Sequence, residues 1–83
     1  MKVAIYPGTF DPITNGHLDI ITRSMKFVDK LIIAVSTNNK KKTLFTTNER
    51  LEMIKKVIEN ENFINVEVDF FDGLLMNYAE EKK

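Results

Sequence analysis

The sequence contains no cysteine, so a disulfide framework and a thiolate metal site are both excluded. An excess of one charge is also lacking, because 12 basic and 12 acidic side chains cancel. Without a global field we expect neither nucleic acid nor an anionic membrane as a partner, and any anion must be bound locally. The apolar runs are too short to cross a membrane, and no signal-like stretch precedes Pro7. These absences predict a soluble protein of the reducing cytoplasm.

The 83 residues suit one small domain, which we place at residues 1–83. Hydrophobic residues make up 43% of the chain and charged residues 29%, a balance typical of globular proteins rather than of disordered ones. Neither internal repeats nor low-complexity linkers divide the sequence.

Apolar periodicity predicts three strand-then-helix units. Short apolar runs that end at turn residues indicate strands, and apolar residues three to four positions apart indicate helices. The predicted strands cover 2–6, 30–36 and 65–71, and the predicted helices lie in 17–28, 46–58 and 72–79. Such an alternation favours right-handed crossovers and a parallel sheet with helices on both faces. The fold class is therefore α/β with the order βαβαβα.

The ends of these elements carry their own signals. Thr14 or Asn15 is suited to cap the first helix, and Thr46 with Glu49 has the spacing of a capping box. The continuous apolar run of 30–36 is typical of a central parallel strand. The alternation in 65–71 instead predicts a half-exposed strand near an edge of the sheet.

In parallel sheets, ligands bind beyond the carboxyl ends of the strands, which here selects the loops 6–17, 36–46 and 71–74. The common phosphate-binding signatures, G-x-x-x-x-G-K-[ST] and G-x-G-x-x-G, do not occur. Instead, Gly8 and Gly16 bracket the first loop, where we expect them to allow positive φ and a close approach of backbone N–H groups to an anion. His17, at the start of the following helix, then projects toward a bound triphosphate.

The stretch YPGTFDPITNGH (6–17) resembles the signature of the nucleotidylyltransferase superfamily, whose T-x-G-H element is here Thr14 to His17. In this form it is similar to the bacterial phosphopantetheine adenylyltransferase family. The segments NNKKKTLFTTNER (38–50) and FFDGLLMNYA (70–79) support that resemblance. The resemblance implies a Rossmann-like fold, a hexamer, and Mg²⁺-dependent transfer of AMP from ATP to 4′-phosphopantetheine, which gives dephospho-coenzyme A and pyrophosphate.

The resemblance also implies roles for individual residues. Thr9 orients the incoming phosphate and lies at the ATP site with Phe10 and Gly16. His17 hydrogen-bonds the transferring phosphate and stabilises the transition state. Lys41 binds the phosphate of the acceptor, with Lys40 and Lys42 as alternative registers, and Leu75 contacts the pantetheine arm through its backbone. No residue of this sequence is assigned as a metal ligand, and the sequence does not show the position of the metal.

Each role has a structural alternative. A lone histidine is usually structural, a lysine run is usually a solvated loop, and Leu75 fits a helix core. Two other functions also stay open: a nucleotidylyltransferase with another acceptor, such as nicotinamide mononucleotide or glycerol phosphate, and a catalytically inactive Rossmann-like fragment. Thr14 stands where such relatives have a histidine, which favours phosphopantetheine.

The resemblance ends with the sequence, because the family's later arginine-bearing and serine-rich segments have no counterpart here. We therefore interpret 1–83 as the N-terminal half of the enzyme. Because those segments bind nucleotide and phosphate, we predict that the 83 residues alone are inactive.

Overall fold

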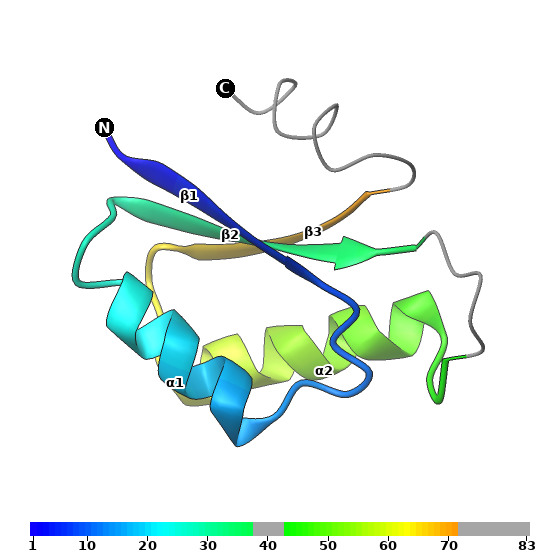
Figure 1. Ribbon diagram of the computed structural model, residues 1–83. Helices are drawn as coiled ribbons and strands as arrows, with labels where there is room; N and C mark the ends of the chain where they lie inside the picture. The colour runs from blue at the N-terminus through cyan, green and yellow to red at the C-terminus, as the bar shows by residue number, and fades with distance from the viewer. Residues whose placement is uncertain (38–42, 72–83) are drawn as a thin grey trace.

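The structure, a computed structural model, describes residues 1–37 and 43–71. Strands and helices alternate along the chain, as predicted (Figure 1). The elements are β1 (Val3–Gly8), α1 (Asn15–Ser24), β2 (Lys30–Ser36), α2 (Thr47–Asn60) and β3 (Val66–Phe71). Among these described elements, neither helix has the length and apolar character that a membrane span requires. The third predicted helix, in 72–79, lies outside the described residues.

The described strands form one parallel sheet in the order β1-β2-β3. In the register, Ile33 of β2 lies opposite Tyr6 on one side and Val68 on the other. The five residues Leu31 to Val35 are all buried, which confirms the central position predicted for this strand. β3 lies at an edge of the described sheet, which also agrees with its alternating sequence.

Both described helices lie on the same face of the sheet (Figure 1). The expectation of helices on both faces is therefore not met within the described part of the chain. The strand order explains this arrangement. Both crossover connections lead to the next strand in the same direction across the sheet, from β1 to β2 and from β2 to β3. Because parallel crossovers of this kind are right-handed, their helices lie on the same face of the sheet.

The main core lies between this face and the helices. It contains the inward side chains of the strands together with one buried side chain from each helix and one from the first loop: Phe10, Ile21, Leu31, Ile33, Val35, Ile54 and Val66. Ile32 and Ala34 point to the other face, where Ile5 and Phe71 contact them. Successive side chains of β2 thus pack into apolar clusters on opposite faces of the sheet, which explains why the strand has no polar face.

The alternation predicted for the third strand fails at its end. Val66 is buried and Val68 is partly buried against the main core, but Phe70 is 56% exposed. Phe71, on the other face, makes the apolar contact with Ile32 and Ala34. The pattern correctly predicts which side chains share a face, but not how far the helices extend along it.

Candidate active site at the carboxyl ends of the strands

Thr14 caps α1, and the residue that completes the cap, at the third position of the helix, is unusual because it is His17. The Thr14 side chain accepts a hydrogen bond from the His17 N–H at 3.4 Å, and the Thr14 N–H donates to Nδ1 of His17 at 2.9 Å. This is the reciprocal arrangement of a capping box, with histidine in the place of the usual Glu or Gln. Because Nδ1 accepts this bond, the proton of the neutral ring lies on Nε2.

Two aromatic rings hold His17 in place. Its ring centroid lies 4.8 Å from that of Phe10 and 6.1 Å from that of Tyr6. The rings of Tyr6 and Phe10 meet edge to face at 5.2 Å and 82°. Such contacts leave the imidazole little rotational freedom. The cap and the rings together orient Nε2–H of His17, the sequence-predicted catalytic residue, as a hydrogen-bond donor.

The backbone of the first loop is held in an uncommon conformation at Phe10. Its φ is 50°, in the left-handed region that a bulky residue rarely adopts. Phe10 as a whole residue is only 3% exposed, whereas the neighbouring Thr9 is exposed. Phe10 is therefore a packing residue in this structure, and its predicted contact with ATP stays a prediction. Such strain persists where surrounding contacts enforce it, often at ligand sites.

The positive φ predicted for the two glycines of the first loop is wrong, and their predicted close approach to an anion stays a prediction. Neither has a positive φ, which belongs to Phe10 instead. A Cβ on Gly8 would lie 3.0 Å from Cε2 of Phe10, so Gly8 leaves room for that ring. A Cβ on Gly16 would meet only Oγ1 of Thr14, at an ordinary 3.6 Å. The protein's own packing does not require glycine at 16.

A buried arginine joins the ends of three elements. Nη1 of Arg50 donates to the carbonyl oxygen of Thr9 at 2.8 Å and to that of Ser36 at 3.1 Å. Nη2 donates to Oγ1 of Thr47 at 3.0 Å. Thr9 follows β1, Ser36 ends β2 and Thr47 begins α2, so one guanidinium links all three. Arg50 is 0% exposed, and its Nε has no hydrogen-bond partner among the described residues.

Asp11 makes a second link between the same segments. Its carboxylate accepts hydrogen bonds from the N–H groups of Leu44 and Phe45, the latter at 2.8 Å. Leu44 and Phe45 precede α2, so the loop after β1 lies beside the segment that leads into this helix (Figure 1). The next peptide bond, between Asp11 and Pro12, is cis. Asp11 and Arg50 thus fix the first loop against the second.

The structure brings together four of the six predicted site residues. Thr9 and Phe10 are in the first loop, and Gly16 and His17 are in the first turn of α1. Among the residues described, the N–H groups of Gly16 and of its neighbour Asn15 have no acceptor, as is usual at a helix start. Lys41 and Leu75 lie outside the described residues. The predictions for these two, and the choice among Lys40, Lys41 and Lys42, stay predictions.

Within 1–37 and 43–71, no group of three or more His, Asp or Glu side chains has the arrangement of a metal site. This part of the chain therefore offers no cage for a divalent cation. Mg²⁺ is commonly bound through the phosphates of a nucleotide and water, with only one or two carboxylates.

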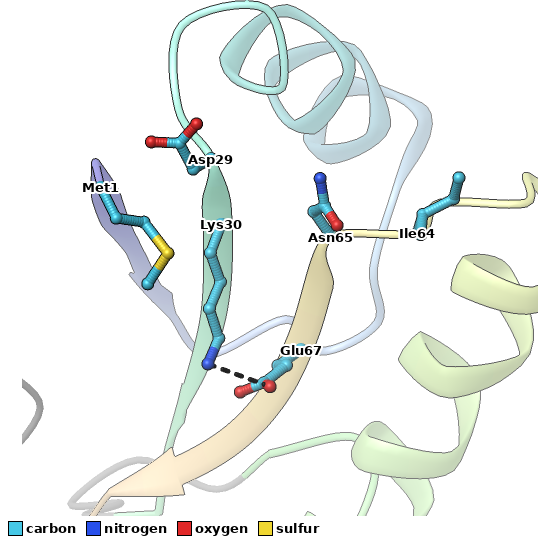
Figure 2. A pocket seen from close by; sticks show the side chains of 6 residues that line it. All are labelled: Met1, Asp29, Lys30, Ile64, Asn65 and Glu67. Atoms are coloured by element: carbon cyan, nitrogen blue, oxygen red, sulfur yellow. Dashed lines mark ion pairs between the residues drawn. The ribbon is translucent and has the colours of Figure 1, made fainter.

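A shallow cavity of about 230 Å³ lies at the opposite end of the sheet (Figure 2). It is open, and Lys30 in its wall pairs with Glu67 at 3.0 Å between Nζ and Oε1. Since it lies at the amino ends of β2 and β3, it has no part in the site described above. Its lining residues are Met1, Asp29, Lys30, Ile64, Asn65 and Glu67.

Sequence reasoning missed Arg50 and Asp11 as parts of the site. For Arg50 a signal exists, because it shares a helix face with Ile54 and Ile58, at four-residue spacing, in the stripe that packs on the core. A charged residue on such a face must have buried partners. Asp11 has no comparable signal, since an aspartate before a proline is common in turns.

Known proteins match the chain along its whole length. Residues 5–82 match the cytidylyltransferase-like family. The whole chain is 58% identical to the phosphopantetheine adenylyltransferase of Clostridium botulinum strain 657 and 57% identical to that of Clostridium beijerinckii. The chain covers 49% and 51% of those proteins, so it spans about half the length of the curated relatives it matches.

The fold is also that of a solved nucleotidyltransferase. A bifunctional NMN adenylyltransferase/ADP ribose pyrophosphatase from Francisella tularensis, in complex with AMP and a manganese ion, superimposes with a TM-score of 0.75. The match covers 99% of this chain and 25% of that protein at 24% identity, and so supports the Rossmann-like α/β fold alone. On the family match and the identity to its relatives, the chain belongs to the cytidylyltransferase-like family of nucleotidyltransferases.

Proposed function

We propose that the complete protein transfers AMP from ATP to 4′-phosphopantetheine and releases pyrophosphate, a step in coenzyme A biosynthesis. The observation that carries the proposal is the oriented Nε2–H of His17 at the start of α1, with its ring against that of Phe10, which follows the exposed Thr9. The 58% identity to a phosphopantetheine adenylyltransferase along the whole chain supports the choice of acceptor.

The proposed reaction needs no nucleophile from the protein. A phosphate oxygen of phosphopantetheine attacks the α-phosphorus of ATP, a new P–O bond forms, and the bond to the bridging oxygen of pyrophosphate breaks. The protein's task is to align the two phosphates and to stabilise charge on the equatorial oxygens. His17 donates from Nε2 to one of these oxygens, and the free N–H groups of Asn15 and Gly16 face the same charge.

The other groups hold the acceptor and the metal. Thr9 is proposed to orient the attacking phosphate, Lys41 to bind it as a point charge, and Leu75 to contact the pantetheine arm. Mg²⁺ would neutralise charge on the phosphates of ATP. The proposal extends to a homohexamer in the cytoplasm, as the family resemblance implies.

A pyrophosphate-release assay tests the proposal with three acceptors in parallel: 4′-phosphopantetheine, nicotinamide mononucleotide and glycerol phosphate. We expect turnover with the first alone. We also expect His17→Ala to lower kcat about 100-fold or more with a small effect on ATP binding, because its hydrogen bond strengthens in the transition state. Turnover with another acceptor would correct the substrate, and near-normal kcat in His17→Ala would remove this residue from the mechanism.

A further inference from the structure

We propose that Arg50 is a positioning residue for adenylyl transfer: its guanidinium fixes the backbone at Thr9 and so sets the place of the attacking phosphate. The inference rests on the proposed function. Arg50 itself is 0% exposed and touches no ligand position, so it acts through the carbonyl oxygen of Thr9.

The shape of the guanidinium matches this task. Its two terminal nitrogens reach the Thr9 carbonyl, the Ser36 carbonyl and the Thr47 hydroxyl at 2.8, 3.1 and 3.0 Å. These groups belong to the ends of β1 and β2 and to the start of α2. A planar fork with fixed donor directions can join three such groups, whereas a lysine ammonium is a compact charge on a flexible stem.

Stability alone does not account for Arg50. Within the described ranges, no carboxylate lies within ion-pair distance of its guanidinium, and Nε has no hydrogen-bond partner. Burying a charge without a counter-charge is unfavourable, and an apolar side chain of similar volume is often the more stable choice at such a place. Among the described residues, the three hydrogen bonds are the feature that accounts for a guanidinium buried at this place, and they fix the geometry of the segments that they join.

The held segment is the one that carries the site. Thr9 is followed by Phe10 with its φ of 50°, and the Phe10 ring lies against His17. When the Thr9 carbonyl is released, Phe10 can relax toward a more common conformation. Both the attacking phosphate and the imidazole donor then lose alignment, and a shift of about 1 Å costs roughly 100-fold in rate.

Arg50→Lys in the complete enzyme tests the inference, with Arg23→Lys as the matched control. Arg23 is on the exposed surface of α1, where it pairs with Asp19. We expect Arg50→Lys to lower kcat by roughly 10- to 100-fold while the KM for ATP changes little, and Arg23→Lys to leave both unchanged. We also expect faster amide hydrogen exchange in residues 6–14 of Arg50→Lys, with unchanged exchange in β2.

If Arg50→Lys has the same kcat as the parent enzyme and the same amide hydrogen exchange in residues 6–14, the inference is overturned. Exchange that rises equally in β2 would also overturn it, because it would mean general destabilisation.

If Arg50→Lys does not fold, Thr47→Val decides, since it removes one of the three contacts and keeps the charge. A kcat reduced a few-fold with faster exchange in 6–14 supports the inference, and parent behaviour in both refutes it. If the parent enzyme itself does not adenylylate phosphopantetheine, the proposed function fails, while hydrogen exchange still decides on Arg50.

Discussion

Replacement of Gly16 by alanine separates the needs of the fold from those of the ligand. Gly16 is the second residue of α1, and an added Cβ would meet only the Thr14 hydroxyl at 3.6 Å. The substitution is therefore free of internal strain. Alanine is favoured over glycine in helices by about 0.5–1 kcal/mol. For the complete enzyme, this predicts a melting temperature higher by about 1–4 °C.

The same Cβ would stand where a phosphate must approach the free N–H groups of the helix start. Overfilling a close contact costs about 1–3 kcal/mol, which corresponds to roughly 5- to 150-fold weaker ATP binding. Calorimetric titration of ATP and a thermal melt on the same sample measure both effects. Thr22→Ala, on an exposed part of the same helix, is the control. It should raise the melting temperature slightly and leave ATP binding unchanged. Parent-like ATP affinity in Gly16→Ala would refute the reasoning, since no ligand would then approach this backbone.

The remaining predictions concern Gly8 and Lys41. Gly8→Ala places a Cβ 3.0 Å from Cε2 of Phe10. It should destabilise the complete enzyme by about 1–3 kcal/mol, seen in urea unfolding, and an unchanged midpoint would contradict the packing described here. Lys41→Ala should weaken phosphopantetheine binding about tenfold or more with little effect on ATP, because it removes a point charge for the acceptor phosphate. Separate titrations of the two ligands measure this, and a loss confined to ATP would reverse the assignment of Lys41.

Much of the fold is predictable because it depends on local patterns. The continuous apolar run at 30–36 fixes a central strand, since only a strand buried on both faces needs such a sequence. Thr46 and Glu49 form the predicted capping box, with bonds of 3.0 and 3.1 Å. These features are set by residues within a few positions of one another, so the sequence alone specifies them.

The candidate site was predictable only where a motif lies in one continuous stretch. Thr14, Gly16 and His17 are adjacent in sequence, and the structure places them in one helix start. The link from Arg50 to Thr9 spans 41 positions and that from Asp11 to Phe45 spans 34, and no local pattern encodes such separations. The positive φ at Phe10 has the same origin, because contacts from distant elements impose it against the residue's own preference.

These long-range links also explain how a chain of zero net charge would bind the anionic ligands of the proposed function. The buried guanidinium of Arg50 and the positive end of the α1 dipole both lie at the carboxyl edge of the sheet, and Lys41 belongs in sequence to the loop after β2. Elsewhere in the described residues some charges are paired, as between Asp19 and Arg23 or Lys30 and Glu67. A balanced composition is therefore compatible with a local positive field, and this local field is what would act on the triphosphate of the proposed function within a Debye length of about 8 Å. Under the proposed function, phosphates would therefore be bound by local groups at this edge rather than by the net charge of the chain.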